Sequence, residues 1–149
     1  MPRKILIMHV IFLTLLACQV ESPHATTPLV CPGLAPTLPQ FTQQISPLLE
    51  KRCGDALCHG RPERPYALYA AGARRLDPAT LWKAPLTGEE VKANYASTLG
   101  FLDNPYPRQT TLVLKAVGLL GHKGGSVFAA PSDPECQAVI AWMLGQEAP

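Results

Sequence analysis

Two thiols and an imidazole lie within seven residues of one another, in the stretch Cys53-Gly54-Asp55-Ala56-Leu57-Cys58-His59. A cysteine pair that ends in Cys-His is the arrangement that attaches haem c, because the thiols form thioethers to the vinyl groups and the histidine ligates the iron. The common motif has two residues between the cysteines, whereas this one has four. The spacing therefore leaves two alternatives: a widened haem-attachment motif, or a disulfide beside a histidine.

The wider spacing requires the backbone between the two cysteines to leave the regular helix. On a regular helix, cysteines three positions apart point about 60° from each other, and cysteines five positions apart about 140°. Both thiols reach one haem only if Gly54-Asp55 loops out, and glycine and aspartate suit such a turn. A disulfide between Cys53 and Cys58 makes the same demand, because the two positions are too far apart on a helix.

A bacterial lipoprotein signal is expected at the N-terminus. Two cations precede an apolar run at residues 5–17, which is too short to span a bilayer as a permanent helix. The run ends in Leu15-Leu16-Ala17-Cys18, which resembles the lipoprotein cleavage box. The resemblance implies cleavage before Cys18 and attachment of membrane lipid to its sulfur; an ordinary secretory signal is the alternative. Gln19 resembles the sorting signal for the outer membrane, which implies a lipid-anchored protein of the bacterial cell envelope, on the periplasmic face of that membrane.

Composition limits the partners and the fold. The chain has 149 residues, enough for one domain, and removal of residues 1–17 leaves eleven basic and eleven acidic side chains. A charge near zero without a basic stripe argues against a nucleic-acid partner. Sixteen prolines and eleven glycines predict an all-α domain of short helices and long loops. We place a Pro-rich tether at residues 18–38 and the domain at residues 39–149.

The cysteine count is consistent with both alternatives for the motif. Lipidation of Cys18 leaves four thiols, which allow three pairings. One allocation gives Cys53 and Cys58 to haem and pairs Cys31 with Cys136. The other makes a second disulfide from Cys53 and Cys58, and the count does not choose between them.

The spacing of apolar residues predicts the helices. A first helix at residues 39–52 is interrupted at Pro47, with Ser46 as a fresh N-cap. A capping box at Thr87 and Glu90 opens a second helix that ends near Gly100. Residues 111–117 are predicted to form a short helix rather than a strand, and Ser132-Asp133-Pro134-Glu135 is predicted to cap the last helix, at residues 133–144.

The segment between the motif and the capping box supplies packing groups and charge. Tyr66 and Leu76 are expected to pack in the core, and Leu81-Trp82 to form a turn against it. Arg74-Arg75 is expected to be a solvated basic pair; a haem propionate is the alternative partner for one of them.

Four features in order resemble the cytochrome c-like domains of bacterial lipoproteins and secreted proteins. They are Ile45-Ser46-Pro47-Leu48-Leu49 before the motif, Cys58-His59-Gly60, His122-Lys123-Gly124-Gly125, and a terminal helix with Asp133 and Trp142. The resemblance covers about residues 39–145. It implies a haem c electron carrier rather than an enzyme, with thioethers at Cys53 and Cys58, His59 as proximal iron ligand and a redox protein, not identified by the sequence, as partner.

The second iron ligand is not settled by the resemblance. Glycines on both sides of His122 let the backbone approach a flat macrocycle closely, although the residue also fits a polar loop. Met143 lies on the apolar face of the last helix and is expected in the core. His24 lies in the tether, and we expect no role for it. Two imidazoles give a lower potential than a His/Met pair.

Three other functions remain as alternatives. Cys53, Cys58, His59 and His122 are zinc ligand types, but adjacent Cys58 and His59 side chains rarely converge on one tetrahedral ion. A Cys-His hydrolase would lack a recognisable third orienting residue. The main alternative is a non-haem lipoprotein of cytochrome-like ancestry, held by two disulfides and acting as a binding or structural module.

Overall fold

The computed structural model describes residues 33–148, and these residues form a helical body without a β-strand. The expected all-α class is therefore confirmed for this part of the chain. None of its helices has the length and apolar character needed to cross a membrane. In chain order the elements are α1 (Leu38–Gln40), a π-helical turn (Phe41–Ile45), α2 (Ser46–Cys53), a 3₁₀ turn (Pro78–Thr80), α3 (Gly88–Leu99), a second 3₁₀ turn (Pro107–Gln109), α4 (Thr111–Ala116) and α5 (Pro134–Met143).

The first predicted helix is continuous but widened before Pro47. The backbone N–H of Ser46 donates to the carbonyl of Phe41, five residues earlier, which is the hydrogen bond of a π-turn. Pro47 has no N–H to continue the regular ladder, and a π-turn accommodates that loss. The prediction that Ser46 is an N-cap was wrong, because its backbone is helical and its hydroxyl donates to Glu50 at 2.9 Å.

The core lies between this first helical segment and α5. Trp142, Met143 and Phe41 are fully buried, and the Phe41 and Trp142 ring centroids are 5.3 Å apart. The indole N–H of Trp142 donates to the carbonyl of Thr37 at 3.0 Å, so this buried polar atom is satisfied. The prediction that Met143 is a core residue is confirmed.

The start of α3 follows its sequence signal. The Thr87 side chain accepts from the backbone N–H of Glu90, and the Glu90 carboxylate accepts from the backbone N–H of Thr87. The predicted capping box is therefore confirmed. Asp133 caps α5 in the predicted way by accepting from the backbone N–H of Glu135, and Gly145 follows the helix with φ of +66°.

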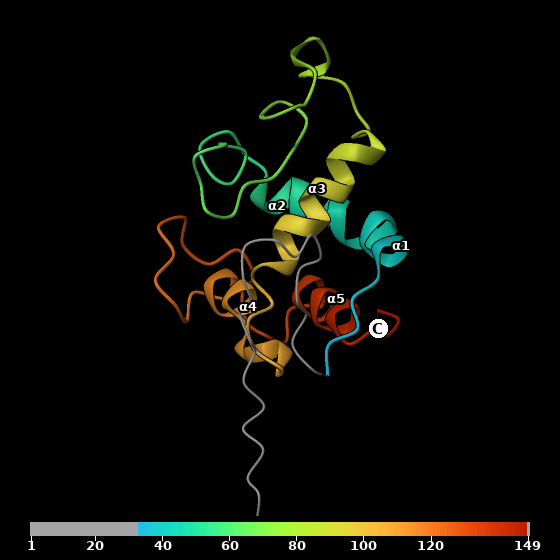
Figure 1. The fold of residues 1–149 in the computed structure, drawn as a ribbon. Helices are drawn as coiled ribbons and strands as arrows, with labels where there is room; N and C mark the ends of the chain where they lie inside the picture. Colours follow the sequence, from blue (N-terminus) through green and yellow to red (C-terminus); the bar gives the residue numbers. More distant parts are fainter. Residues whose placement is uncertain (1–32, 149) are drawn as a thin grey trace, which may run out of the picture.

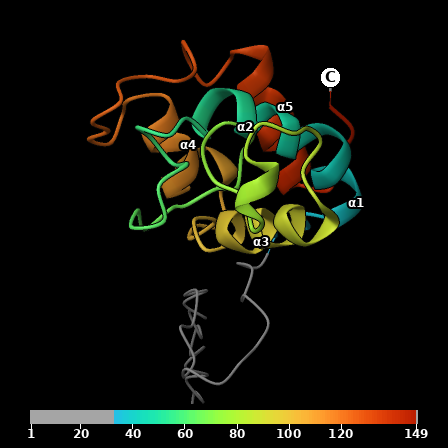
Figure 2. The same ribbon diagram turned by 90° about the horizontal axis from the view of Figure 1, so that it is seen from above.

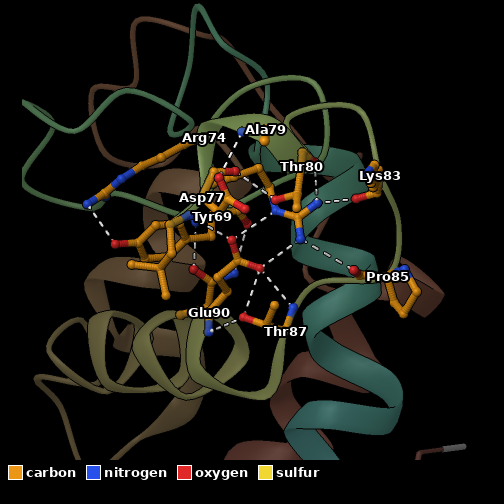
Figure 3. Close-up of polar contacts among 12 residues, drawn as sticks. Tyr69, Arg74, Asp77, Ala79, Thr80, Lys83, Pro85, Thr87 and Glu90 are labelled. Carbon is orange, nitrogen blue, oxygen red and sulfur yellow. Dashed lines mark hydrogen bonds and ion pairs between the residues drawn. The ribbon is translucent and has the colours of Figure 1, made fainter.

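A buried ion pair organises the loop between α2 and α3. Arg75 Nε and Glu90 Oε1 are 2.9 Å apart, and both side chains are almost fully buried. The guanidinium also donates to the carbonyls of Thr80, Lys83 and Pro85, so all of its donor positions face acceptors (Figure 3). The prediction that Arg75 belongs to a solvated basic pair was therefore wrong. Arg75 is instead the centre around which residues 75–87 fold.

Two other expectations for this loop were wrong. Trp82 is 80 % exposed and lies over Gly72 rather than against the core, and Leu76 is 50 % exposed. The positive φ of Gly72, +79°, and the lack of a Cβ there give the indole its resting place. Tyr66, in contrast, is buried as predicted.

Two long loops leave the helical body, residues 54–87 after α2 and residues 117–133 between α4 and α5. The early part of the green loop and the whole orange loop project from the same side of the body in Figures 1 and 2. The first carries Cys58 and His59 and the second carries His122, so the fold brings the predicted site residues to one side.

Candidate functional site

The cysteine motif begins where α2 ends. Cys53 is the last residue of α2, and the Gly54 N–H donates to the carbonyls of Leu49 and Glu50. Beyond it the Asp55 carbonyl accepts from the backbone N–H groups of both Cys58 and Gly60, each at 2.9 Å. The chain therefore leaves the helix at Gly54-Asp55, as the spacing of the cysteines demands.

The turn brings His59 back beside the start of the motif. Its backbone N–H donates to the carbonyl of Cys53 at 3.0 Å. Gly54 and Gly60 allow this close approach: an added Cβ at Gly60 would lie 2.5 Å from the Gly54 carbonyl oxygen and 2.5 Å from the Ala73 Cβ. The glycine after the Cys-His pair is thus required for space.

The ring of His59 is held in one tautomer. Its Nδ1 lies 2.7 Å from the carbonyl oxygen of Tyr66, and because a carbonyl only accepts, Nδ1 carries the proton. Nε2 therefore keeps its lone pair. Burial lowers the pKa of His59, and the nearby cations of Arg64 and Lys115 lower it further. The imidazole is consequently neutral at neutral pH, which is the form that binds a metal.

The ring of His122 has the matching arrangement. Its Nδ1 lies 2.7 Å from the carbonyl oxygen of Gly125, so Nδ1 carries a proton there too. The two imidazole planes differ by only 7°, and their centroids are 5.7 Å apart. No hydrogen bond from any described residue engages Nε2 of either ring. Two nearly parallel imidazoles thus line the site, each with an Nε2 atom that no described residue engages.

All four residues line one cavity of about 430 Å³. This volume lies within the range of about 300–1,000 Å³ that is typical of small-molecule and cofactor sites. Of the two thiols, Cys53 is 7 % exposed and Cys58 is exposed. Burial raises the pKa of the Cys53 thiol to about 12. The apolar part of the lining is Leu57, Pro65, Tyr66, Phe101, Leu112, Ala116 and Val127.

Three cations at this cavity were not expected from the sequence. Arg64, Lys115 and Lys123 line it, and no carboxylate does among the described residues. Lys115 comes from α4, so only the fold reveals that it lies near the motif. The two arginines expected as alternative propionate partners, Arg74 and Arg75, do not line this cavity: Arg74 lies 4.2 Å over the Tyr69 ring, and Arg75 is paired with Glu90.

The site does not have the geometry of a zinc centre. Within residues 33–148 no group of three or more His, Cys, Asp and Glu side chains is arranged to hold one metal ion. The thiols of Cys53, Cys58 and Cys136 are all free, so Cys53 and Cys58 form no disulfide here.

Several predicted positions lie outside the described residues. They are the signal at residues 1–17, the lipidated Cys18, His24 and Cys31. The possible partner of Cys31, Cys136, is a fully buried thiol on α5.

The geometry of these residues defines a class of site. Two thiols and two imidazoles lie around one largely apolar cavity of a small helical domain, and three cations also line that cavity. No protein-family model, no curated protein and no solved structure matches the chain. The functional assignment therefore depends on the geometry of this cavity.

Proposed function

We propose that this protein is a lipid-tethered, cytochrome c-like domain that binds haem c covalently and transfers single electrons. The observation that carries the proposal is the pair of parallel imidazoles, His59 and His122, each with its Nε2 free of hydrogen bonds from the described residues, in the cavity that also presents Cys53 and Cys58. Electron transfer needs no general base and no substrate pocket, so the proposal does not require an enzyme.

The residues fit a haem by type. Cys53 and Cys58 would hold the two vinyl groups as thioethers, and His59 and His122 would ligate the iron. The apolar lining supplies a low-dielectric surface for a macrocycle, and the cations Arg64, Lys115 and Lys123 supply partners for its two carboxylates. Bound haem would supply an iron that cycles between the ferric and ferrous states.

The protein's own groups set the conditions for that cycle. The Tyr66 carbonyl fixes the tautomer and orientation of His59, as hydrogen-bond acceptors commonly do for metal-bound histidines. The Gly125 carbonyl does the same for His122. Two imidazoles favour a lower potential than an imidazole and a thioether.

The location of the protein is part of the proposal. Lipidation at Cys18 would hold the domain at the membrane of the bacterial cell envelope, on the periplasmic face of the outer membrane. A tether raises the local concentration of the domain near membrane-bound redox partners. The alternative, a disulfide-held binding module, would need a Cys53–Cys58 bond in place of the two thioethers.

The first experiment is expression of the full chain in a host with haem c maturation. We expect a reduced pyridine haemochrome spectrum that persists after denaturation, and an intact mass increased by one haem. The matched variant Cys53→Ala/Cys58→Ala should lose the covalent haem, whereas Cys136→Ser should keep it. A colourless product with oxidised thiols would overturn the proposal in favour of the disulfide-held module.

A further inference from the structure

The two histidines of the cavity are held to different degrees. Three contacts from other segments fix His59: its N–H donates to Cys53, its carbonyl accepts from the N–H of Leu68 at 2.7 Å, and its ring lies 4.8 Å from that of Tyr66. The lack of space for a Cβ at Gly60 confines the next residue too. His59 therefore cannot move without opening the motif loop.

The polar contacts of His122, in contrast, remain within its own turn. Its Nδ1 bonds the Gly125 carbonyl, and its carbonyl accepts from the Gly125 N–H at 2.9 Å. Every residue at positions 118–126 is exposed except His122 itself, which is half-buried. The ring thus reaches into the cavity from a turn that lies in solvent.

This turn is attached to α4 at its two ends. The N–H groups of Leu119 and Leu120 donate to the Leu114 carbonyl, and the Val127 N–H donates to the Ala116 carbonyl. Between these ends, the side-chain bond that joins the turn to α4 is Lys115 Nζ to the Gly121 carbonyl, at 3.0 Å. The Lys115 side chain therefore holds the turn against α4.

The backbone of the turn is suited to movement. Four of its residues are glycines, and Gly118 and Gly125 have φ of +75° and +74°. Glycine crosses between backbone regions at little steric cost, and such positions absorb the dihedral changes of loop motions. Few buried contacts and an exposed backbone are the features of a segment with low local stability.

We propose that His122 is the exchangeable ligand of the pair and that the position it vacates takes a small anion. This inference rests on the proposed function. Arg64, Lys115 and Lys123 line the cavity without a carboxylate among the described residues. The two carboxylates of a bound haem would balance only two of these three cations, so the site keeps a positive charge and favours an anion over a neutral ligand. When the turn opens, the Lys115 ammonium loses the Gly121 carbonyl and gains a free donor for the anion.

The test uses the haem-loaded full chain and azide, an anion at neutral pH, with imidazole as the neutral probe. Stopped-flow absorption should show an azide-binding rate that levels off at high azide, because opening of the turn limits it. His122→Ala should remove this limit, and Lys115→Met should raise the limiting rate about tenfold and reduce the preference for azide over imidazole. Lys92→Met, an exposed lysine on α3, is the matched control and should change neither.

A second measurement is independent of haem. In the haem-free full chain, hydrogen exchange followed by mass spectrometry should be faster at residues 118–126 than at residues 53–60. Equal protection of the two segments would overturn the exchangeable turn. A haem-loaded protein that binds no azide would overturn the inference and leave the proposed function intact, whereas a colourless protein overturns both.

Discussion

Cys53 and Cys58 belong to one motif but have different chemical environments. Cys53 ends α2 and is 7 % exposed, whereas Cys58 lies in the following turn and is exposed. Burial raises the pKa of Cys53 to about 12, because a thiolate there would lose its hydration. Since the thiolate is the reactive form, the two cysteines should react at very different rates.

We expect iodoacetamide at pH 8 to alkylate Cys58 in the haem-free native protein well before Cys53. A thiol with a pKa of about 12 is about one part in ten thousand thiolate at that pH. Peptide mass spectrometry after timed quenching would measure the order. Cys136, with a pKa raised to about 11 and no exposure, is the internal control for a buried thiol. Equal labelling of Cys53 and Cys58 would contradict the buried position of Cys53.

Gly60 offers a second test at this scale. In Gly60→Ala the new Cβ would meet the Gly54 carbonyl oxygen and the Ala73 Cβ, each at 2.5 Å, so the motif turn must shift. We expect the free energy of unfolding in urea to fall by about 1–3 kcal/mol, as for other overpacked sites. Gly88→Ala is the control: nothing lies within 4 Å of its added Cβ, and it should be neutral or stabilising by up to about 1 kcal/mol. A loss as large in Gly88→Ala would point to a general effect of losing glycine.

Among the elements, the 70–87 loop depends on one ion pair. The Glu90 carboxylate accepts from the Arg75 guanidinium, from the backbone N–H of Leu76 and from Thr87, so one side chain joins the loop to the start of α3. Arg75→Met leaves this buried carboxylate without its cation and should cost about 3–5 kcal/mol of unfolding free energy. Arg75→Met/Glu90→Leu should recover part of the loss, because no unpaired charge remains. If the double variant is less stable than Arg75→Met, the stabilisation resides in the other bonds of the cluster.

The same pair predicts how stability depends on pH. Hydrogen bonds from Arg75 lower the pKa of Glu90 from 4.5 to about 2 in the folded protein. A carboxyl with a lowered folded pKa stabilises the protein above its unfolded pKa and loses that contribution as pH falls to the folded value. The urea midpoint should therefore fall between pH 5 and pH 2, and Arg75→Met/Glu90→Leu should flatten this fall. Burial raises the pKa of Glu50, so Glu50→Gln should steepen it instead.

The sequence predicts elements well where their determinants are local. Thr87 and Glu90 cap α3 from within one turn, and Asp133 caps α5 in the same way, so both were predicted correctly. Arg75 was misjudged because its partner is fifteen residues away, and Trp82 because its resting place is Gly72. The cavity depends on both local and long-range determinants. The motif residues could be identified from their types, whereas Lys115 lies at the cavity only because of the way α4 packs.

For the molecule as a whole, residues 35–37, which fall within the segment expected to be a tether, pack on the helical body. The Ala35 N–H donates to the Met143 carbonyl at 2.8 Å, and the Tyr95 hydroxyl donates to the Pro36 carbonyl at 2.9 Å. Residues 35–37 thus lie along the C-terminal end of α5. A Cβ added at Gly33 would lie 3.8 Å from the Pro105 carbonyl oxygen, next to the 3₁₀ turn that packs on α5.

The position of residues 35–37 beside α5 bears on the pairing of Cys31 with Cys136. Cys136 lies seven residues before Met143, which is about 10 Å along a helix axis, and the four-residue step from position 35 to position 31 spans up to about 13 Å. Cys31 itself lies outside the described residues, but a chain of that length can span the distance to Cys136, and we expect the two to form a disulfide in an oxidising compartment. Closing a loop of this length should add about 4–5 kcal/mol of stability.

Peptide mapping of the exported protein without reduction would detect this disulfide directly. Cys136→Ser should lower the urea midpoint only when the protein is prepared under oxidising conditions, because the reduced parent lacks the same constraint. Cys31→Ser is the matched variant and should behave identically, while the haemochrome yield should be unchanged in both. A bond between Cys53 and Cys58 instead would contradict the prediction, and it would also remove the two thiols on which haem attachment depends. The allocation of four cysteines thus connects the stability of the domain to its proposed function.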